Sequence, residues 1–215
     1  MATPLLTHLR QCSWWPAAID RLRERVEQPD GGSLGTYADV YMGRRAAMVV
    51  DVVASRQRRY EAVVLRIVSD FDQRHPSVTL EELGESGPGG TRPTPREQET
   101  IQRAAAGLAR FCAERGLDED EGCRRWAQEA EPVRLAPSLD PYVGGKGIGI
   151  ALFAYMRMRS GADAVKPDLR VRRAMRELGF ENIVDDVALV LVVEAAAETL
   201  GVTPFQLDRV LWPAA

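Results

Sequence analysis

The sequence predicts an all-α protein, and two features of its pattern support this prediction. Apolar residues recur at intervals of three and four along most of the chain, which is the spacing of one helix face. Proline and glycine stand where helices would begin and end, and the sequence shows no convincing pair of strands. With 215 residues, 45% of them hydrophobic, the chain is long enough to bury a sizeable core.

The first half of the chain contains three of the predicted helices and one loop. The stretch 42–71 fits two helices that meet near residues 55–59. The segment 84–95 has a run of Gly and Pro residues that a helix would not tolerate, so we expect an exposed loop there. Thr94, followed by a proline, provides an N-cap for a helix that ends near Gly116.

The second half is predicted to contain further helices and one connector over residues 132–141. The helices are expected over residues 118–130, 148–159, 168–179, 183–200 and 203–212. The stretch 183–200 is rich in β-branched residues, so a strand is a competing prediction. Acidic residues before and after its apolar centre favour a buried helix instead.

Charge is distributed unevenly along the chain. The formal net charge of -3 argues against a strongly basic protein that binds nucleic acid indiscriminately. Residues 144–176 nevertheless contain eight Lys or Arg residues and only two Asp residues, a local excess of six positive charges. Such a block is typical of a phosphate-binding face, and the alternative is a helix with a solvated arginine face.

Cysteine and histidine usage gives no indication of a metal site. Cys12, Cys112 and Cys123 are odd in number and lack C-x-x-C spacing, so neither a disulfide framework nor a zinc or iron–sulfur site is indicated. His8 and His75 are isolated from partners. No apolar run reaches the ~18 residues of a membrane span, so we expect a soluble, cytoplasmic monomer that does not bind membranes.

The most informative motif is the glycine-rich segment 144–149, which precedes a predicted helix. Glycine lets the backbone approach a ligand closely, and the first amides of a helix lack partners, so such a hairpin can bind a phosphate. Its predicted contact residues are Gly145, Lys146, Gly147 and Gly149. A tight turn without a ligand is the alternative.

Asp168 lies nineteen residues after Gly149, in the segment 166–171. This order of hairpin and acid resembles the helix-hairpin-helix DNA glycosylases of the endonuclease III superfamily. In that family a Pro-Gly-Val-Gly hairpin, similar to residues 146–149 here, is followed about twenty residues later by a catalytic Asp. The resemblance therefore implies that Asp168 is catalytic.

Two upstream segments resemble the same family. Residues 52–59 are similar to its Leu-Ser-Gln-Gln-Thr segment, which ends a helix near the DNA, and residues 76–83 are similar to the Pro-Thr-x-x-x-Leu stretch that follows. The resemblance implies that Gln57 fills the gap left by an extruded base. Arg56, Arg58 and Arg59 would contact flanking phosphates, although an exposed helix end with solvated charge is the alternative.

The resemblance implies two helical lobes with a DNA-binding cleft between them. We expect residues 43–161 to form a central bundle that includes the helix-hairpin-helix, and residues 1–42 with 162–215 to form the second lobe. A pocket for the flipped base would need aromatic side chains. The candidates, for which packing in the core is favoured, are Trp14, Trp15, Tyr37, Tyr41 and Trp126.

Departures from the family narrow the expected chemistry. Ala151 stands where bifunctional members have a Schiff-base lysine, and no cysteine follows Cys123, so neither lyase chemistry through that residue nor an iron–sulfur cluster is expected. Arg170 stands where His is common, and we include it among the DNA-binding residues. The resemblance also implies a possible monovalent cation at the hairpin carbonyls.

The resulting functional prediction is monofunctional hydrolysis of the N-glycosidic bond of a modified or damaged base in duplex DNA. Asp168 would stabilise the oxocarbenium-like transition state and orient water, whereas helix capping alone is the alternative role for it. Two other functions stay open. The protein could be a catalytically inactive DNA-binding or partner-binding module, or it could hydrolyse a free nucleoside or nucleotide. The sequence does not identify the base.

Overall fold

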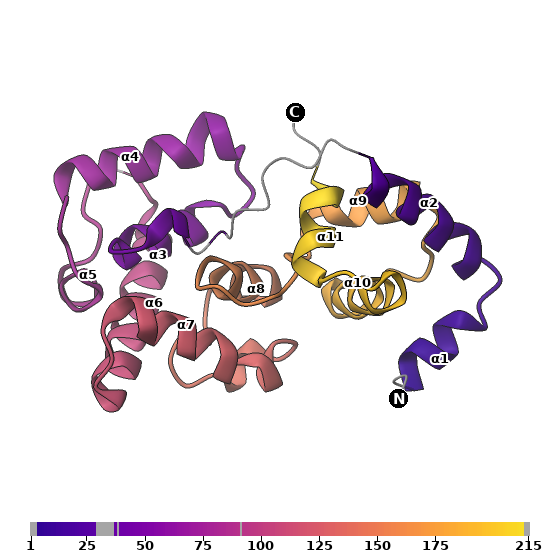
Figure 1. The fold of residues 1–215 in the computed structure, drawn as a ribbon. Helices are drawn as coiled ribbons and strands as arrows, with labels where there is room; N and C mark the ends of the chain where they lie inside the picture. Colours follow the sequence, from indigo (N-terminus) through magenta and orange to yellow (C-terminus); the bar gives the residue numbers. More distant parts are fainter. Residues whose placement is uncertain (1–3, 29–36, 38, 91, 213–215) are drawn as a thin grey trace. The chain divides into compact units, whose positions relative to one another are not determined.

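The computed structural model describes residues 4–28, 37, 39–90 and 92–212, and all regular secondary structure in these ranges is helical (Figure 1). The predicted all-α fold class is confirmed. The chain divides into two compact units. We call Thr36–Ala162 the middle unit, and Met1–Gly35 together with Asp163–Ala215 the terminal unit.

The middle unit contains helices α3 to α8, with the longest connection running from α7 to α8. The α-helices are α3 (Arg45–Ala54), α4 (Leu65–Arg74), α5 (Leu80–Ser86), α6 (Pro95–Arg115), α7 (Glu119–Glu129) and α8 (Ile150–Arg159). The shorter elements are the 3-10 turns Asp39–Tyr41, Glu131–Val133 and Pro137–Leu139, and the π-helical turn Tyr60–Val64 that leads into α4. The predicted break between two helices near residues 55–59 is confirmed.

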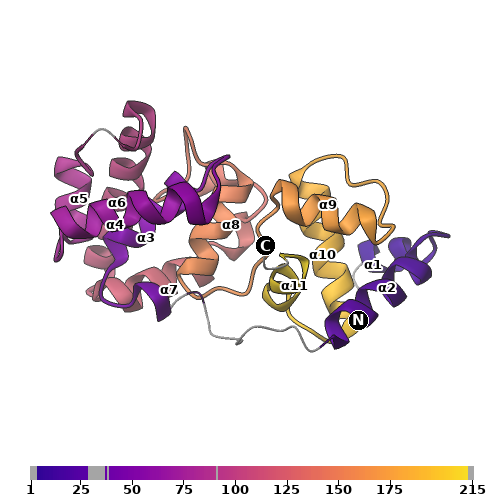
Figure 2. The ribbon, with the colours of Figure 1, turned by 90° about the horizontal axis from the view of Figure 1, so that it is seen from above.

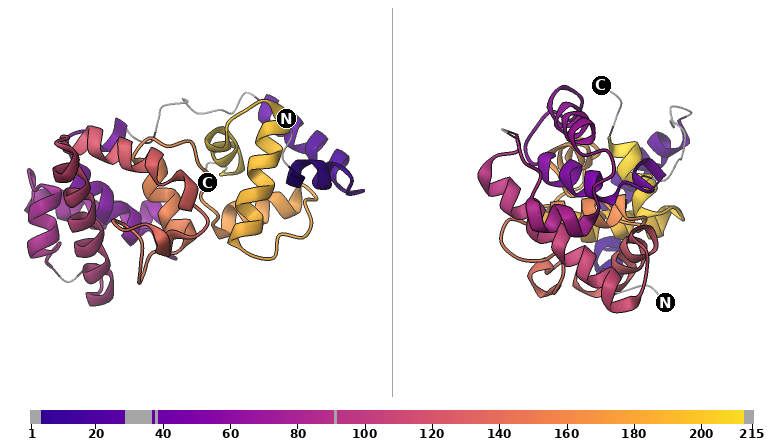
Figure 3. Two further views of the ribbon diagram at one scale, coloured as in Figure 1. Left: turned by 90° about the horizontal axis from the view of Figure 1, so that it is seen from below. Right: turned by 90° about the vertical axis from the view of Figure 1, so that its left-hand side faces the viewer.

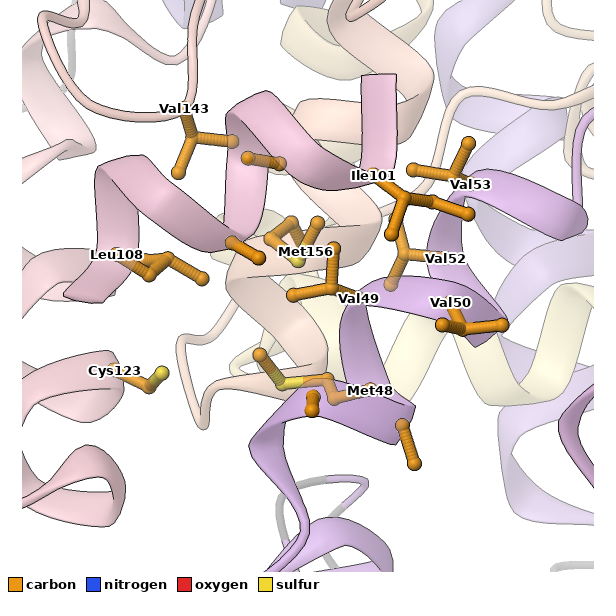
Figure 4. Packing of buried hydrophobic residues seen from close by; sticks show 14 of the residues in the cluster. Met48, Val49, Val50, Val52, Val53, Ile101, Leu108, Cys123, Val143 and Met156 are labelled. Atoms are coloured by element: carbon orange, nitrogen blue, oxygen red, sulfur yellow. The ribbon is translucent and has the colours of Figure 1, made fainter. Parts of the chain in front are cut away.

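Helix α3 lies at the centre of the middle unit because its sequence is apolar on nearly every side. All ten of its residues are buried, and it contacts α4, α5, α6, α7 and α8. Figure 4 shows side chains of α3, such as Met48 and Val52, packed with Ile101 of α6 and Met156 of α8. This core fixes the positions of the segments on either side of α3 and α8.

The terminal unit is assembled from both ends of the chain. Its helices are α1 (Pro4–Arg10), α2 (Trp15–Glu27), α9 (Leu169–Glu177), α10 (Asp186–Leu200) and α11 (Pro204–Leu211). Figures 2 and 3 show the indigo helix α2 beside the yellow helices α10 and α11, and these three helices contact one another. The apolar segment 183–200 forms a buried helix, as favoured, and not a strand.

Side-chain caps explain where several helices begin and end. Thr94 and Glu97 form a capping box at the start of α6, which ends at Gly116 in the left-handed conformation. Asp185 caps α10 by accepting a hydrogen bond from the Ala188 amide at 2.8 Å, and Thr203 caps α11. The cap predicted at Thr94 is confirmed.

The predicted loop over residues 84–95 is confirmed in part, because residues 87–94 separate α5 from α6 and most of those described are exposed, but two details differ. Gly84 lies inside α5, where a Cβ atom would meet the Ala106 backbone at 2.8 Å, so glycine permits close packing of α5 against α6. Pro88 and Pro93 are buried, and the carbonyl of Pro88 accepts a hydrogen bond from Arg74 at 3.1 Å. The two prolines therefore hold part of this loop against the rest of the middle unit.

Two boundaries also differ from the sequence-based ones. The helix expected from residue 148 begins at Ile150, with Gly149 in the N-cap position. The middle unit starts at Thr36 and not at residue 43, and it ends at Ala162. Tyr41 accounts for the earlier start, because it is buried in the core of the middle unit.

Candidate nucleic-acid interface and acid cluster

The hairpin 144–149 connects the 3-10 turn Pro137–Leu139 to α8. Asp140 organises the approach to it, since its Oδ1 accepts hydrogen bonds from the amides of Tyr142, Val143 and Gly144 at 3.0, 2.6 and 3.3 Å. Its Oδ2 accepts a further bond from the Trp126 indole at 3.2 Å. Asp140 is buried, so the hairpin starts from a fixed backbone.

The hairpin requires glycine at Gly147. Its φ angle is +94°, and a Cβ atom there would lie 2.6 Å from Thr100 Oγ1 on α6. Any other residue would strain the backbone and displace Thr100. The hairpin therefore lies directly against α6.

Several backbone amides of the hairpin have no acceptor among the described residues. The Ile148 amide donates to the Gly145 carbonyl at 3.0 Å, whereas the amides of Lys146, Gly147 and Gly149 donate to no described group. The N-cap residue Gly149 provides no side-chain cap for the first amides of α8. This segment therefore exposes a set of unpaired N–H donors and the positive end of a helix dipole.

Two arginines contact the hairpin carbonyls. Arg56, in the turn after α3, donates to the Gly147 carbonyl, and Arg103 of α6 donates to the Lys146 carbonyl. The Nε of Arg103 is buried without a partner among the described residues. We name Arg56, Arg103 and residues 144–149 the hairpin cluster. Sequence analysis missed Arg103, because no local signal distinguishes it from other arginines on exposed helix faces.

The predicted DNA-binding residues Gln57 and Arg58, which follow α3, differ from each other in exposure and in partners. Gln57 is exposed and has a φ angle of +52°, so it occupies the tip of the turn next to Arg56. Arg58 is bound to Glu97 through two hydrogen bonds of 2.6 and 2.9 Å. Burial alone would raise the pKa of Glu97. The hydrogen bonds from Arg58 and Thr94 outweigh this effect, so the pKa of Glu97 lies below its ordinary value. Arg58 thus connects this turn to α6.

Asp168 lies in the terminal unit as the N-cap of α9. Its Oδ1 accepts hydrogen bonds from the amides of Arg170 and Val171 at 2.9 and 3.1 Å, and its Oδ2 accepts one from the Trp212 indole at 3.1 Å. The Arg170 guanidinium lies 4.2 Å from the centre of the Trp212 ring. The structure therefore brings Asp168 and Arg170 together with Trp212, which sequence analysis did not assign to a site.

A second acid, Asp208 of α11, is influenced by the charge of Asp168 and was also missed. It is buried, with 3% of its surface exposed, and its Oδ1 accepts a hydrogen bond from the Lys166 amide at 2.9 Å. Burial, with a smaller contribution from the charge of Asp168, raises the pKa of Asp208 to about 7. We name Asp168, Asp208 and Trp212 the acid cluster.

The aromatic candidates for a base pocket contact other side chains of the protein. Tyr37 and Tyr41 lie 4.6 and 5.2 Å from the Arg159 guanidinium, measured to the ring centres. Trp14 and Trp15 pack edge-on against Phe180, at 6.0 and 5.7 Å between ring centres. Trp126 is buried in the core of the middle unit. Most of these aromatic residues are buried in a core, as the sequence analysis favoured.

Arg159 is the centre of a buried polar network in the middle unit. Its guanidinium forms an ion pair with Asp51 at 3.0 Å and donates to the hydroxyl groups of Tyr60 and Tyr155 at 2.6 Å each. Both hydroxyl groups also bond to Asp51. Burial and the charge of Asp51 raise the pKa values of Tyr41, Tyr60 and Tyr155, so these phenols stay neutral at physiological pH.

The basic block over residues 144–176 does not form one phosphate-binding face, contrary to the expectation from its sequence. Arg157 and Arg159 are buried within the middle unit, where their partners are Glu131 and Asp51. Arg172 of the terminal unit pairs with Asp186 at 2.6 Å. Residues in a helix point in different directions around its axis, so these charges do not share one face. Each of the three arginines forms an ion pair with an acidic side chain.

Two further findings concern the described residues as a whole. No group of three or more His, Cys, Asp or Glu side chains in the described ranges could hold a metal ion. No single helix among the described residues has the length and apolar character to cross a membrane. Only α10 and α11 taken together, bent by 107°, meet that test of length and composition.

Fold and clusters define an all-α protein of two units. One unit has a glycine hairpin whose carbonyls accept hydrogen bonds from two arginines, and the other has two acids, Asp168 and Asp208, that each accept hydrogen bonds from backbone amides. The chain belongs to the family described as a domain of unknown function (DUF8548), whose model matches residues 78–215. The matched region includes residues 144–149 and the acid cluster. No curated protein and no solved structure matches the chain.

Proposed function

We propose that the protein binds duplex DNA through the hairpin cluster and hydrolyses the N-glycosidic bond of a modified base without cleaving the strand. The observation that carries this proposal is the hydrogen bond from Arg56 to the Gly147 carbonyl. It joins two segments that are 91 residues apart in sequence, and the resemblance to helix-hairpin-helix glycosylases implies that both segments contact DNA.

The unpaired amides of Lys146, Gly147 and Gly149 support phosphate binding. A phosphate oxygen can accept hydrogen bonds from such amides, and the dipole of α8 favours negative charge at this end. Lys146 on the hairpin and Arg103 of α6, which donates to the Lys146 carbonyl, add positive charge at this segment. Contacts of this kind position the DNA backbone without reading its sequence.

The monovalent cation expected at the hairpin carbonyls would compete with two side chains. The carbonyls of Lys146 and Gly147 already accept hydrogen bonds from Arg103 and Arg56. A guanidinium group supplies positive charge at the position where a cation would otherwise supply it. In this proposal, therefore, the two arginines perform the structural role of the cation.

In the proposed reaction the bound DNA presents an extruded nucleotide to Asp168. The carboxylate stabilises the cationic sugar as the bond to the base breaks, and it orients the water molecule that bonds to the sugar carbon. The proton released by that water neutralises the departing base. Ala151 has no amine, so no covalent intermediate forms at that position.

A second candidate function, DNA binding without chemistry, is favoured by the hydrogen bonds of Asp168. Two backbone amides and the Trp212 indole already occupy most of its acceptor positions. Such a carboxylate would also be selected simply as a helix cap. In this alternative the hairpin cluster acts as proposed, and Asp168 stabilises α9.

The experiment that separates these functions uses a panel of duplexes that each contain one modified base. We expect the protein to bind the duplexes and to release one free base, identified by mass spectrometry, with the strand left intact. Binding to every duplex without release of any base would establish the second candidate. Release from a nucleoside, with no duplex binding at low salt, would show that the substrate is the smaller molecule.

Lys146→Ala is expected to weaken binding to all duplexes alike and to reduce the slope of log affinity against log salt concentration by about one. The reason is the loss of one phosphate contact, since Lys146 is exposed on the hairpin. The measurement is fluorescence anisotropy over a series of salt concentrations. Arg125→Ala is the control, because it removes an exposed charge on α7, and an equal change in slope for both variants would contradict the assignment.

A further inference from the structure

Helix α11 places two side chains next to Asp168. Asp208 and Trp212 are four residues apart, and the Trp212 amide donates to the Asp208 carbonyl at 3.0 Å, which continues the helical turn. Helix α11 is attached to the segment before α9 by two hydrogen bonds in opposite directions. The Lys166 amide donates to Asp208 at 2.9 Å, and the Phe205 amide donates to Asp163 at 2.9 Å.

The hydrogen bonds of Asp168 leave its carboxylate with little freedom. A carboxylate has about four acceptor positions, two on each oxygen. Both positions on Oδ1 are used by the amides of Arg170 and Val171, and one position on Oδ2 is used by Trp212. One position on Oδ2 therefore remains for a water molecule or a sugar, and the Trp212 bond determines its direction.

Trp212 is itself fixed on a second side. The Arg170 guanidinium lies 4.2 Å from the centre of its ring, so the indole is stacked as well as hydrogen-bonded. Arg170 is exposed, whereas Asp208 is buried. Trp212 thus contacts an exposed arginine of α9 and lies one helical turn after the buried Asp208 on the α11 side.

We propose that Trp212 and Asp208 are positioning residues for Asp168: Trp212 directs the remaining acceptor position of Oδ2, and the charge state of buried Asp208 sets the electrostatic field at the Asp168 carboxylate. The catalytic meaning of this inference rests on the proposed function. Its geometric and electrostatic content concerns the acid cluster itself, and it is testable without substrate.

The charged groups that act on Asp208 come from three segments. Asp168, at the start of α9, raises the pKa of Asp208 further after burial has raised it, while Lys166 and Arg209 lower it. The balance places the change of charge near pH 7. Asp168 therefore experiences a nearby carboxylate above this pH and a neutral carboxylic acid below it.

The first test is NMR spectroscopy of the protein with ¹³C-labelled Asp carboxyl groups. We expect the Asp168 signal to show a step near pH 7 in the wild type, no step in Asp208→Asn, and an unchanged step in Asp163→Asn. The last variant is the matched control, since Asp163 accepts one backbone hydrogen bond across the same two segments. A step that persists in Asp208→Asn would overturn the electrostatic part of the proposal.

Stability gives an independent readout of Asp208. Folding raises the pKa of Asp208 from 3.8 to about 7, so in this window the folded protein binds a proton that the unfolded chain has lost. The contribution of Asp208 to stability is therefore lost as pH rises. We expect the free energy of unfolding of Asp208→Asn, measured with urea, to increase relative to that of the wild type as pH rises from about 4 to 7. A difference in unfolding free energy that does not change with pH would contradict a raised pKa for Asp208 in the folded protein.

The second test concerns Trp212 and uses Trp212→Phe, which keeps a ring for Arg170 and removes the N–H donor. We expect the Asp168 carboxyl signal to shift, and kcat for base release to fall about tenfold to a hundredfold with KM unchanged. Trp14→Phe is the control for the NMR signal, because the Trp14 indole nitrogen donates to no described group.

The outcomes separate the two proposals. If the wild type releases no base, the proposed function fails, while the NMR titrations still decide the positioning of Asp168. If base release depends on Asp168 but Trp212→Phe leaves kcat and the Asp168 signal unchanged, the inference about Trp212 is overturned and the proposed function stands.

Discussion

Asp168→Asn is expected to reduce base release by at least about a hundredfold while leaving affinity for duplex DNA within about twofold. Asparagine is as good an N-cap as aspartate, so its side-chain oxygen can still accept from the amides of Arg170 and Val171 and α9 remains in place. What the variant loses is the negative charge that would stabilise the oxocarbenium-like transition state. Single-turnover release of the free base measures this effect.

The matched control for this prediction is Asp185→Asn, the same change at the N-cap of α10 in the same unit. It should leave base release unaltered, and both variants should have unfolding midpoints close to that of the wild type. Equal rates for Asp168→Asn and wild type would remove Asp168 from the reaction and leave it the role of a cap.

Asp51→Ala is expected to lower the free energy of unfolding of the middle unit by about 3–5 kcal/mol. Asp51 is fully buried, and its removal leaves the Arg159 guanidinium, 5% exposed, without its counter-charge. The hydroxyl groups of Tyr60 and Tyr155 lose an acceptor at the same time. Urea denaturation followed by circular dichroism measures the change.

Asp72→Ala provides the comparison for a surface ion pair. Asp72 binds Arg44 at 2.7 Å, but both side chains are partly exposed, so its removal should cost less than about 1 kcal/mol. A cost for Asp51→Ala as small as that for Asp72→Ala would show that the Arg159 network does not stabilise the middle unit.

Local signals were sufficient to predict much of the fold. The Thr-Pro pairs at Thr94 and Thr203, and the glycines at Gly116 and Gly201, mark helix ends because each satisfies backbone groups of its own helix. The loop around Gly84 was predicted wrongly for a related reason. The close approach of α5 to α6 that requires this glycine is a tertiary contact, and no local signal reports it.

The candidate sites depend on contacts between residues that are distant in sequence, and these were only partly predictable. The motif 144–149 and Asp168 stand out by composition and spacing. Arg103, Asp208 and Trp212 acquire their roles only when α6 lies against the hairpin and α11 lies against α9. One arginine or one aspartate in a helix has no sequence feature that marks it for such a contact.

The charge pattern was misleading for the same physical reason. Arg159 counted toward the basic block, but it is buried and bound to Asp51, whose carboxyl group lies 108 positions earlier in the chain. A count of charges along the sequence does not distinguish a solvated arginine from one inside a polar network. The positive charge at residues 144–149 comes from Lys146, which belongs to the block, and from Arg56 and Arg103, which lie outside it.

Backbone amide hydrogen exchange, measured with and without duplex DNA, tests the central claim most directly. The amides of Lys146, Gly147 and Gly149 have no acceptor among the described residues, so they should exchange rapidly in the free protein. If the hairpin cluster binds a DNA phosphate, these amides should become protected when the duplex is saturating. Unchanged exchange at all three, under conditions where the duplex is bound, would contradict the assignment of the hairpin as the DNA-binding element.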